Sequence, residues 1–234
     1  MEKPAVIIEN YEGKNNSPEK YKRFAEMGHY RNMNTVWITP TRGVVPARVI
    51  PSWMAMIGGF NCALVRIFSI RQEVGHAYNN AIVQMLSNPS LKDFPYILTV
   101  EEDNTPPQDG FIRLLEGIQE YDAVSGLYWT KGEDGVPQIW GDPASPNTFV
   151  PQKVIPNTLQ RCNGIGMGFA LWRTEMFKNP EFEFGNWFKT VGGKEGMMTQ
   201  DLYFWQRAAK LGYKCAVDTR VKVGHLDVNT GVIW

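Results

Sequence analysis

The chain has 234 residues, a length typical of one α/β domain, with 43% hydrophobic and 21% charged residues. This composition excludes a disordered chain, a collagen and a coiled coil. Lys and Arg number 24, as do Asp and Glu, so the formal net charge is 0. No global positive field therefore attracts a polyanion or an acidic membrane, although a local basic patch stays open.

Cysteine usage and hydropathy indicate the compartment. The three cysteines, Cys62, Cys162 and Cys215, form no CxxC pair, which argues against a zinc ribbon or a disulfide framework. The N-terminal apolar run is too short for a signal peptide, and the stretch 52–68 is interrupted by Asn61 and Arg66. We expect a soluble cytoplasmic protein with no membrane insertion. The eight tryptophans fit either a Trp-rich core or stacking on sugars and bases.

The first half of the chain alternates predicted strands and helices. Residues 1–33 are polar and are interpreted as an N-terminal arm, followed by a single domain over 34–234. Apolar β-rich runs predict strands at 35–39, 63–68, 94–100 and 123–129. A short helix is expected over 51–57, and apolar stripes predict helices over 74–85 and 111–118. This alternation predicts an α/β fold with a mostly parallel central sheet and helices on both faces.

The second half is less regular. A hairpin turn at 132–135 is expected to return through 137–140, before a loop over 141–160. One glycine-interrupted strand is predicted over 164–172, a loop over 178–200, and a helix over 201–211 that Gly212 ends. Two short strands, 213–217 and 221–224, are expected to close the domain.

An acidic cluster follows the third predicted strand directly. Glu101, Glu102 and Asp103 stand at its carboxyl end, the edge at which open α/β sheets bind ligands. Adjacent carboxylates repel one another unless a cation lies among them, so hard-cation binding beside a phosphate is one interpretation. A solvated acidic turn is the other.

Two further polar residues and a glycine run are candidates for a site. His225 ends a predicted strand and is either structural or a metal ligand. Asp201 opens a helix, where the helix dipole favours its ionised form, so it either stabilises the helix or acts as a general base. Gly164, Gly166 and Gly168 lie in a strand-like run with no helix after it, which excludes a dinucleotide fingerprint and favours close approach of the backbone to a ligand.

In this order, these segments resemble a GT-A fold glycosyltransferase, the family 2-like nucleotide-diphospho-sugar transferases with a Rossmann-like domain. The resemblance covers about residues 35–227. Within it, Asn80 stands where the family has Asn, Asn79 where it has Arg, Glu101 where it has the first Asp of Asp-x-Asp, and Gln200 where it has Glu. Four motifs carry the resemblance: the first strand and nucleotide loop at 35–43, the helix start at 75–82, the strand ending in the acidic motif at 96–103, and the segment 200–213 with 223–225.

The resemblance implies a role for each matched residue. Asp103 and His225 would bind a divalent cation, Mn²⁺ or Mg²⁺, that bridges the diphosphate of a nucleotide sugar, with a UDP-sugar as the expected donor. Asp201 would be the base that activates the acceptor hydroxyl in an inverting reaction. Trp129, Trp140 and Gly166 would contact the acceptor. The donor nucleotide would be bound by Pro40, Thr41, Arg42, Arg71, Asn80, Glu101 and Glu102.

Three functions remain open at this point: a metal-dependent glycosyltransferase, a nucleotidyltransferase of related fold, and a non-catalytic sugar-binding relative. A nucleotidyltransferase usually has a basic, glycine-rich first loop, whereas residues 40–43 supply one Arg. The four polar residues Glu101, Asp103, Asp201 and His225 argue against a relative that has lost catalysis. The acceptor, a saccharide or a modified nucleobase of phage-type DNA among others, is not defined.

Overall fold

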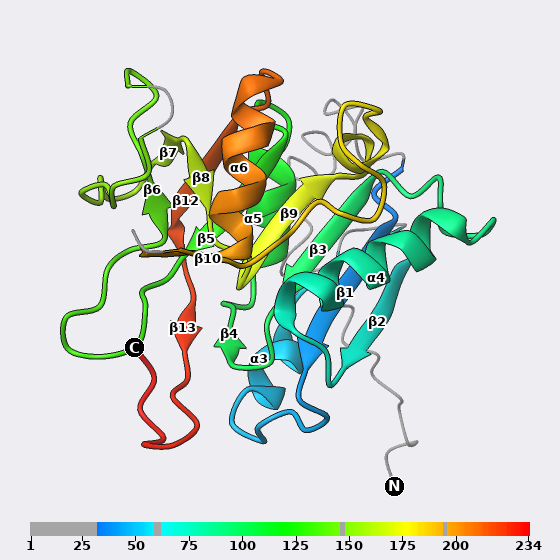
Figure 1. The fold of residues 1–234 in the computed structure, drawn as a ribbon. Helices are drawn as coiled ribbons and strands as arrows, with labels where there is room; N and C mark the ends of the chain where they lie inside the picture. Colours follow the sequence, from blue (N-terminus) through cyan, green and yellow to red (C-terminus); the bar gives the residue numbers. More distant parts are fainter. Residues whose placement is uncertain (1–31, 59–61, 146–147, 194–195) are drawn as a thin grey trace, which may run out of the picture.

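The computed structural model describes residues 32–58, 62–145, 148–193 and 196–234, and its centre is a seven-stranded sheet (Figure 1). The predicted N-terminal arm lies outside the described residues up to position 31. In spatial order the strands are β2 (Leu64–Ile70), β1 (Thr35–Thr41), β3 (Tyr96–Val100), β9 (Phe169–Arg173), β5 (Ala123–Leu127), β12 (Cys215–Lys222) and β7 (Leu159–Cys162).

Five of these seven strands run in the same direction. β1 pairs in parallel with β2 and β3, and β12 pairs in parallel with β5. β9 lies antiparallel between β3 and β5, and β7 lies antiparallel to β12 at one edge. The prediction of a mostly parallel sheet is confirmed.

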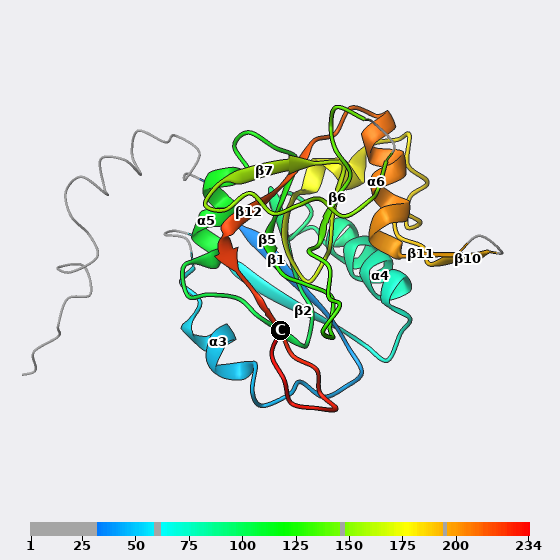
Figure 2. The ribbon, with the colours of Figure 1, turned by 90° about the vertical axis from the view of Figure 1, so that its left-hand side faces the viewer.

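Helices cover both faces of the sheet, as predicted. Figure 2 shows α4 (Val74–Ser87) and α6 (Gln200–Lys210) on one side, and α3 (Ile50–Ala55) and α5 (Gly110–Gly117) on the other. The predicted stripe of α4 faces the core: Ala77, Tyr78, Ala81, Ile82 and Met85 are all buried. Among the described residues, no helix combines the length and apolar character that a membrane span requires.

The segment 164–172 is two strands and not the single strand that we predicted. β8 (Gly164–Ile165) pairs with β6 (Ile139–Trp140), whereas β9 enters the central sheet. The predicted hairpin return through 137–140 forms one bridge with the segment after β5, between Trp129 and Pro137, before its last two residues pair with β8 as β6. Crowding by a side chain explains two glycines of this segment, because a Cβ at Gly166 or Gly168 would collide with the Tyr128 side chain.

Three other expectations for the second half were wrong. The expected loop 141–160 already contains the start of β7, and the expected loop 178–200 contains a hairpin of β10 (Val191–Gly193) and β11 (Gly196–Met198) after a 3-10 helix, η2 (Thr174–Lys178). The two expected closing strands are one strand, β12, with a register shift between Asp218 and Lys222. Buried Asp218 accepts two hydrogen bonds from the Arg220 side chain there, which satisfies its carboxylate inside the sheet. β13 (Gly224–His225) then pairs with β4 (Asn104–Thr105).

Candidate active site

The candidate site lies where the five parallel strands end. Because their carboxyl ends meet at one edge of the sheet, the residues that follow them come together there. Arg42 follows β1, Arg71 follows β2, Glu101 follows β3, and Lys131 lies four residues after β5. His225 follows β12 and is held at this edge by the pairing of β13 with β4.

Glu102 organises the loop after β1. Its buried carboxylate accepts hydrogen bonds from the hydroxyl of Thr41 at 2.6 Å, the backbone N–H of Arg42 at 3.0 Å and the Arg42 guanidinium at 2.5 Å. Arg71, with φ of 57°, donates its backbone N–H to the carbonyl of Thr41 at 2.8 Å. The structure thus groups five predicted donor residues: Pro40, Thr41, Arg42, Arg71 and Glu102.

Asn80 does not join this group through a hydrogen bond among the described residues. It is exposed on α4, and its amide donates to Gln72 at 2.5 Å. The neighbouring Asn79, which stands where the resembled family has Arg, is buried and binds backbone atoms of Trp187 and Phe188. Asn79 is therefore a structural link between α4 and the segment that precedes β10.

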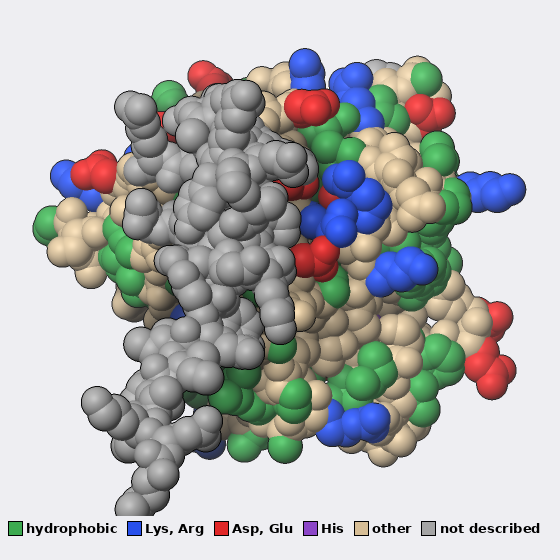
Figure 3. All heavy atoms as spheres, turned by 180° about the vertical axis from the view of Figure 1, so that it is seen from behind, with side chains coloured by type: hydrophobic (Ala, Val, Ile, Leu, Met, Phe, Trp, Pro, Cys, Tyr) green, Lys and Arg blue, Asp and Glu red, His purple; other side chains and the backbone are tan. Residues whose placement is uncertain are grey.

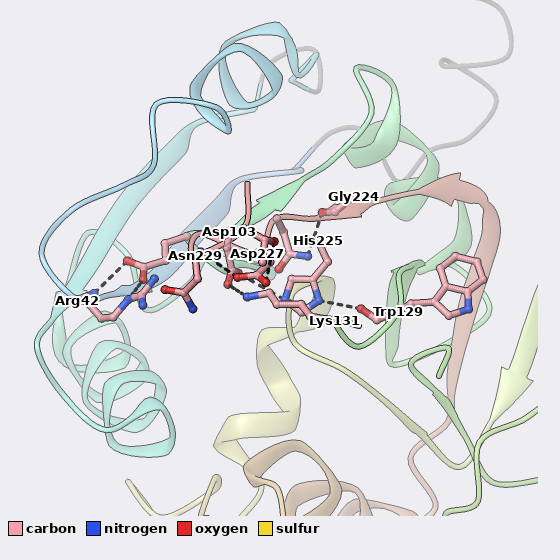
Figure 4. Close-up of polar contacts among 11 residues, drawn as sticks. Arg42, Asp103, Trp129, Lys131, Gly224, His225, Asp227 and Asn229 are labelled. Carbon is pink, nitrogen blue, oxygen red and sulfur yellow. Dashed lines mark hydrogen bonds and ion pairs between the residues drawn. The ribbon is translucent and has the colours of Figure 1, made fainter. Parts of the chain in front are cut away.

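Asp103 and His225 face one another (Figure 4). His225 Nε2 lies 3.8 Å from Asp103 Oδ1, and His225 Nδ1 lies 2.7 Å from the carbonyl oxygen of Trp129. A carbonyl only accepts, so Nδ1 carries the proton and the lone pair of Nε2 is directed toward the Asp103 side. Burial lowers the pKa of His225, and this favours the neutral imidazole that metals bind.

This pair fits a divalent cation. One carboxylate oxygen and one imidazole nitrogen are suitable ligands, and a histidine ligand commonly donates its other N–H to a backbone carbonyl. Within the described part of the chain, no group of three or more His, Cys, Asp or Glu side chains could hold a metal by itself. A cation held by this pair would need further ligands from water or a bound molecule, as is usual for Mg²⁺.

Lys131 is a site residue that our sequence analysis missed. Its ammonium lies 2.5 Å from Asp103 Oδ2, the carboxylate oxygen that does not face His225. Figure 4 shows Lys131, Asp103 and His225 directed toward one another. The contact joins residues 28 positions apart and no local pattern marks it, so the sequence offers no signal for it.

Glu101 lies among other acids and tyrosines. Tyr78 donates its hydroxyl to Glu101 Oε1 at 3.4 Å, and Tyr128 accepts the backbone N–H of Gly168 at 2.8 Å. Removal from bulk water, followed by the nearby carboxylates of Asp103 and Asp201, raises the pKa of Glu101 to about 8. The protonated carboxyl donates hydrogen bonds as well as accepting them.

Asp201 is buried at the start of α6. Its Oδ1 accepts hydrogen bonds from the Thr199 hydroxyl and from the backbone N–H of Leu202 at 2.9 Å. Burial raises the pKa of Asp201, and these hydrogen bonds only partly oppose the rise. The helix dipole favours the ionised form of Asp201, and burial acts in the opposite direction by raising the pKa. The raised pKa makes the carboxylate a stronger base.

The predicted acceptor residues are half-buried or buried. Trp129 contributes its carbonyl to His225, while its indole extends away from Asp103 (Figure 4). Trp140 is half-buried, and its indole N–H donates to Gln138 at 3.3 Å. Gly166 is buried beside Tyr128, which accounts for the glycine without a ligand. Contact of these three residues with an acceptor stays a prediction.

Among solved structures, the chain is similar in fold to A197 from STIV, with a TM-score of 0.57 and 20% sequence identity over 83% of this chain and 86% of that one. S. aureus TarS 1–349, alone and in complex with UDP-GlcNAc, gives TM-scores of 0.46 and 0.44 at 14% and 13% identity over 79% of this chain. The chain spans only 58% and 56% of those TarS chains. No family model matches, and no curated protein matches. The fold is GT-A-like, as the resemblance predicted, and the likeness to A197 extends to the fold alone.

Proposed function

We propose that this protein is a metal-dependent glycosyltransferase that moves a sugar from a nucleotide-diphospho-sugar, with a UDP-sugar as the expected donor, to an acceptor hydroxyl. One observation carries the proposal: Asp103 and His225 face one another at 3.8 Å at the sheet edge where Glu102 orders the loop after β1. The buried carboxylate of Asp201 lies close enough to raise the pKa of Glu101.

The donor would lie along this edge. Arg42, 65% exposed at its side chain, and the backbone of the loop after β1 would bind the nucleotide. Asp103 and His225 would hold Mn²⁺ or Mg²⁺ against the diphosphate. When bound, this ion stabilises the negative charge that develops on the leaving diphosphate. Glu102 would position Arg42 rather than contact the donor itself, because its carboxylate is already occupied.

Asp201 would accept the proton of the acceptor hydroxyl as that oxygen attacks the anomeric carbon. This is the role of a base in an inverting transfer, in which the bond from the sugar to the diphosphate breaks as the new glycosidic bond forms. The hydroxyl of Thr199 and the N–H of Leu202 fix the carboxylate, so its orientation does not depend on the acceptor.

The acceptor is proposed to be a saccharide or a modified nucleobase, with Trp129 and Trp140 close to where it binds. Lys, Arg, Asp and Glu side chains are interspersed on the visible part of one molecular face (Figure 3). Such a mixture gives the visible part of this face no preference for a polyanion.

A donor panel tests the function. Radiolabelled nucleotide sugars are incubated with the protein and mixed acceptors, with and without Mn²⁺, and both transfer and hydrolysis are measured. Metal-stimulated transfer of one sugar supports the proposal. A parallel incubation supplies nucleoside triphosphates and sugar phosphates, and release of pyrophosphate there would identify a nucleotidyltransferase. Binding of nucleotide sugars without turnover would identify a sugar-binding relative.

A further inference from the structure

The carboxylate of Asp103 has two partners, Lys131 at one oxygen and His225 at the other. Oδ2 lies 2.5 Å from the ammonium of Lys131, and Oδ1 lies 3.8 Å from Nε2 of His225. The side chain of Asp103 is 15% exposed and that of Lys131 is 32% exposed. Solvent therefore screens the pair less than an ordinary surface ion pair, and its charge acts on anything that binds beside Oδ1.

The hairpin that contains Trp129 and Lys131 contacts the Asp103 site in two ways: through a backbone carbonyl that binds His225, and through the side chain of Lys131. The backbone carbonyl of Trp129 fixes the His225 ring, and Thr130 closes the hairpin by donating its N–H to Val136 at 2.9 Å and accepting that of Val136 at 2.9 Å. Lys131 reaches Asp103 only through its own flexible side chain. The ammonium can leave Asp103 without moving His225.

We propose that Lys131 is a tethered cation that competes with the divalent ion for Asp103 and moves to a phosphate oxygen when the ion and a diphosphate bind together. This inference rests on the proposed function. A divalent ion between Oδ1 and Nε2 would stand beside the ammonium on Oδ2, and like charges at that separation repel. A diphosphate bound to the ion offers the ammonium a new anion within the same small region.

The alternative is a permanent structural pair that holds the hairpin against Asp103. The two possibilities predict opposite changes when the ammonium is removed. Loss of a competitor strengthens binding of the free ion, whereas loss of a structural partner loosens Asp103 and weakens it. Binding of a diphosphate nucleotide gives a second, independent readout, because only a lysine that transfers to phosphate strengthens it.

The experiment compares wild type with Lys131→Met, which keeps most of the side-chain length and removes the charge. Lys178→Met is the matched control. Lys178 pairs with Glu175 in η2, which follows the end of β9 that lies away from Asp103. Mn²⁺ binding to each protein is measured by electron paramagnetic resonance, and UDP binding in saturating Mn²⁺ by calorimetry. Circular dichroism confirms that each variant is folded.

We expect Lys131→Met to bind Mn²⁺ alone about three- to tenfold more tightly and UDP with Mn²⁺ about tenfold more weakly, the scale of one charge-assisted hydrogen bond. Lys178→Met should match wild type in both. Unchanged or weaker Mn²⁺ binding by Lys131→Met would overturn the competition, and unchanged UDP binding would overturn the transfer to phosphate. In both cases the proposed metal and donor sites stand if wild type binds Mn²⁺ and UDP, and the transferase function itself is decided by the donor panel. If wild type binds no Mn²⁺, the metal site and the competition are both overturned.

Discussion

The aromatic cluster under α4 and α6 and the acidic edge of the sheet are opposite environments in one small domain. Six aromatic side chains of the cluster expose 2% or less of their surface: Trp172, Phe177, Trp187, Phe188, Phe204 and Trp205. The ring of Trp172 lies at centroid distances of 5.5–6.1 Å from four of the other rings. At the acidic edge, four carboxyl groups lie together with two cationic side chains, Arg42 and Lys131, paired to them.

This comparison shows that stability and reactivity are separated in space. Burying large rings is favourable, so the cluster stabilises the fold. Burying an ionised carboxyl group is unfavourable, and burial is the largest of the causes that raise the pKa of Glu101 to about 8. Tyr78 of α4 joins the two regions, because its ring lies 5.8 Å from that of Phe188 while its hydroxyl reaches Glu101 at 3.4 Å.

The largest expected effect is on activity at the acidic edge. We predict that Asp103→Ala lowers transfer by about 10³-fold or more, since an ion at the diphosphate supplies several kcal/mol of transition-state stabilisation. Its melting temperature should hardly change, because the aromatic cluster is intact. Transfer assays with and without EDTA measure this effect. Full wild-type activity in excess EDTA would contradict the metal role of Asp103.

A substitution in the aromatic cluster should lower stability and leave the acidic edge able to bind its ligand. We predict that Trp172→Ala lowers the free energy of unfolding by about 3–5 kcal/mol, the usual cost of truncating a buried Trp. In a chain of this size the melting temperature should fall by about 6–20 °C. Calorimetry measures the stability, and UDP binding at a temperature well below the transition serves as the control. If binding fell while stability held, the two regions would not be separate.

A smaller effect is expected for the proposed base. We predict that Asp201→Asn lowers kcat by about 10²-fold and leaves donor Kd nearly unchanged. Because burial raises the pKa of Asp201, wild-type kcat should fall on acidification at a pH above the range of an ordinary Asp. The base works only when ionised, so activity is lost as the pH falls through that pKa, and the variant should lack this acid limb.

The control for Asp201→Asn is Glu175→Gln, which neutralises an exposed acid in the first turn of η2. Glu175→Gln should keep wild-type kcat and pH profile. Near-normal kcat in Asp201→Asn, with only a lower melting temperature, would make Asp201 a helix-stabilising residue and remove the inverting mechanism.

The smallest effect is expected for the half-buried tryptophans. We predict that Trp129→Ala and Trp140→Ala together raise acceptor KM by the equivalent of about 1–3 kcal/mol if the acceptor is a base. Donor KM should not change. An unchanged acceptor KM in a folded double variant would assign both indoles to packing of the segment 129–140, and would leave the acceptor surface to be found elsewhere.

The sequence predicts the parts of the site that follow buried parallel strands. Glu101 and Asp103 stand directly after an apolar run, and Arg42 stands after another, so the rule for carboxyl ends of strands places them correctly. The apolar stripe of α4 was also predictable, because the spacing of its apolar residues matches the period of a helix. These features depend on local patterns.

The remainder depends on contacts that no local pattern encodes. The antiparallel insertion of β9 puts residues 169–173 between two strands that come earlier in the chain. The pairing of Lys131 with Asp103 depends on where the hairpin turns, and the raised pKa of Asp201 depends on how deeply α6 packs. Charge, pattern and propensity along the chain leave all three open.

The central position of β9 has a consequence for synthesis on the ribosome. In the sheet order of the described strands, β9 separates β3 from β5, so a nascent chain that ends before residue 169 lacks the strand that pairs with one edge of β3 and both strands that pair with β5. Unpaired strand edges are prone to wrong pairing, and in this protein the edges that pair with β9 stay unpaired until β9 has been synthesised. Asp103 and Lys131 are translated before β9, Asp201 and His225 after it. The acidic edge is therefore among the last parts of the protein to form, and a chain that stalls before β9 carries Glu101, Glu102 and Asp103 without Asp201 and His225.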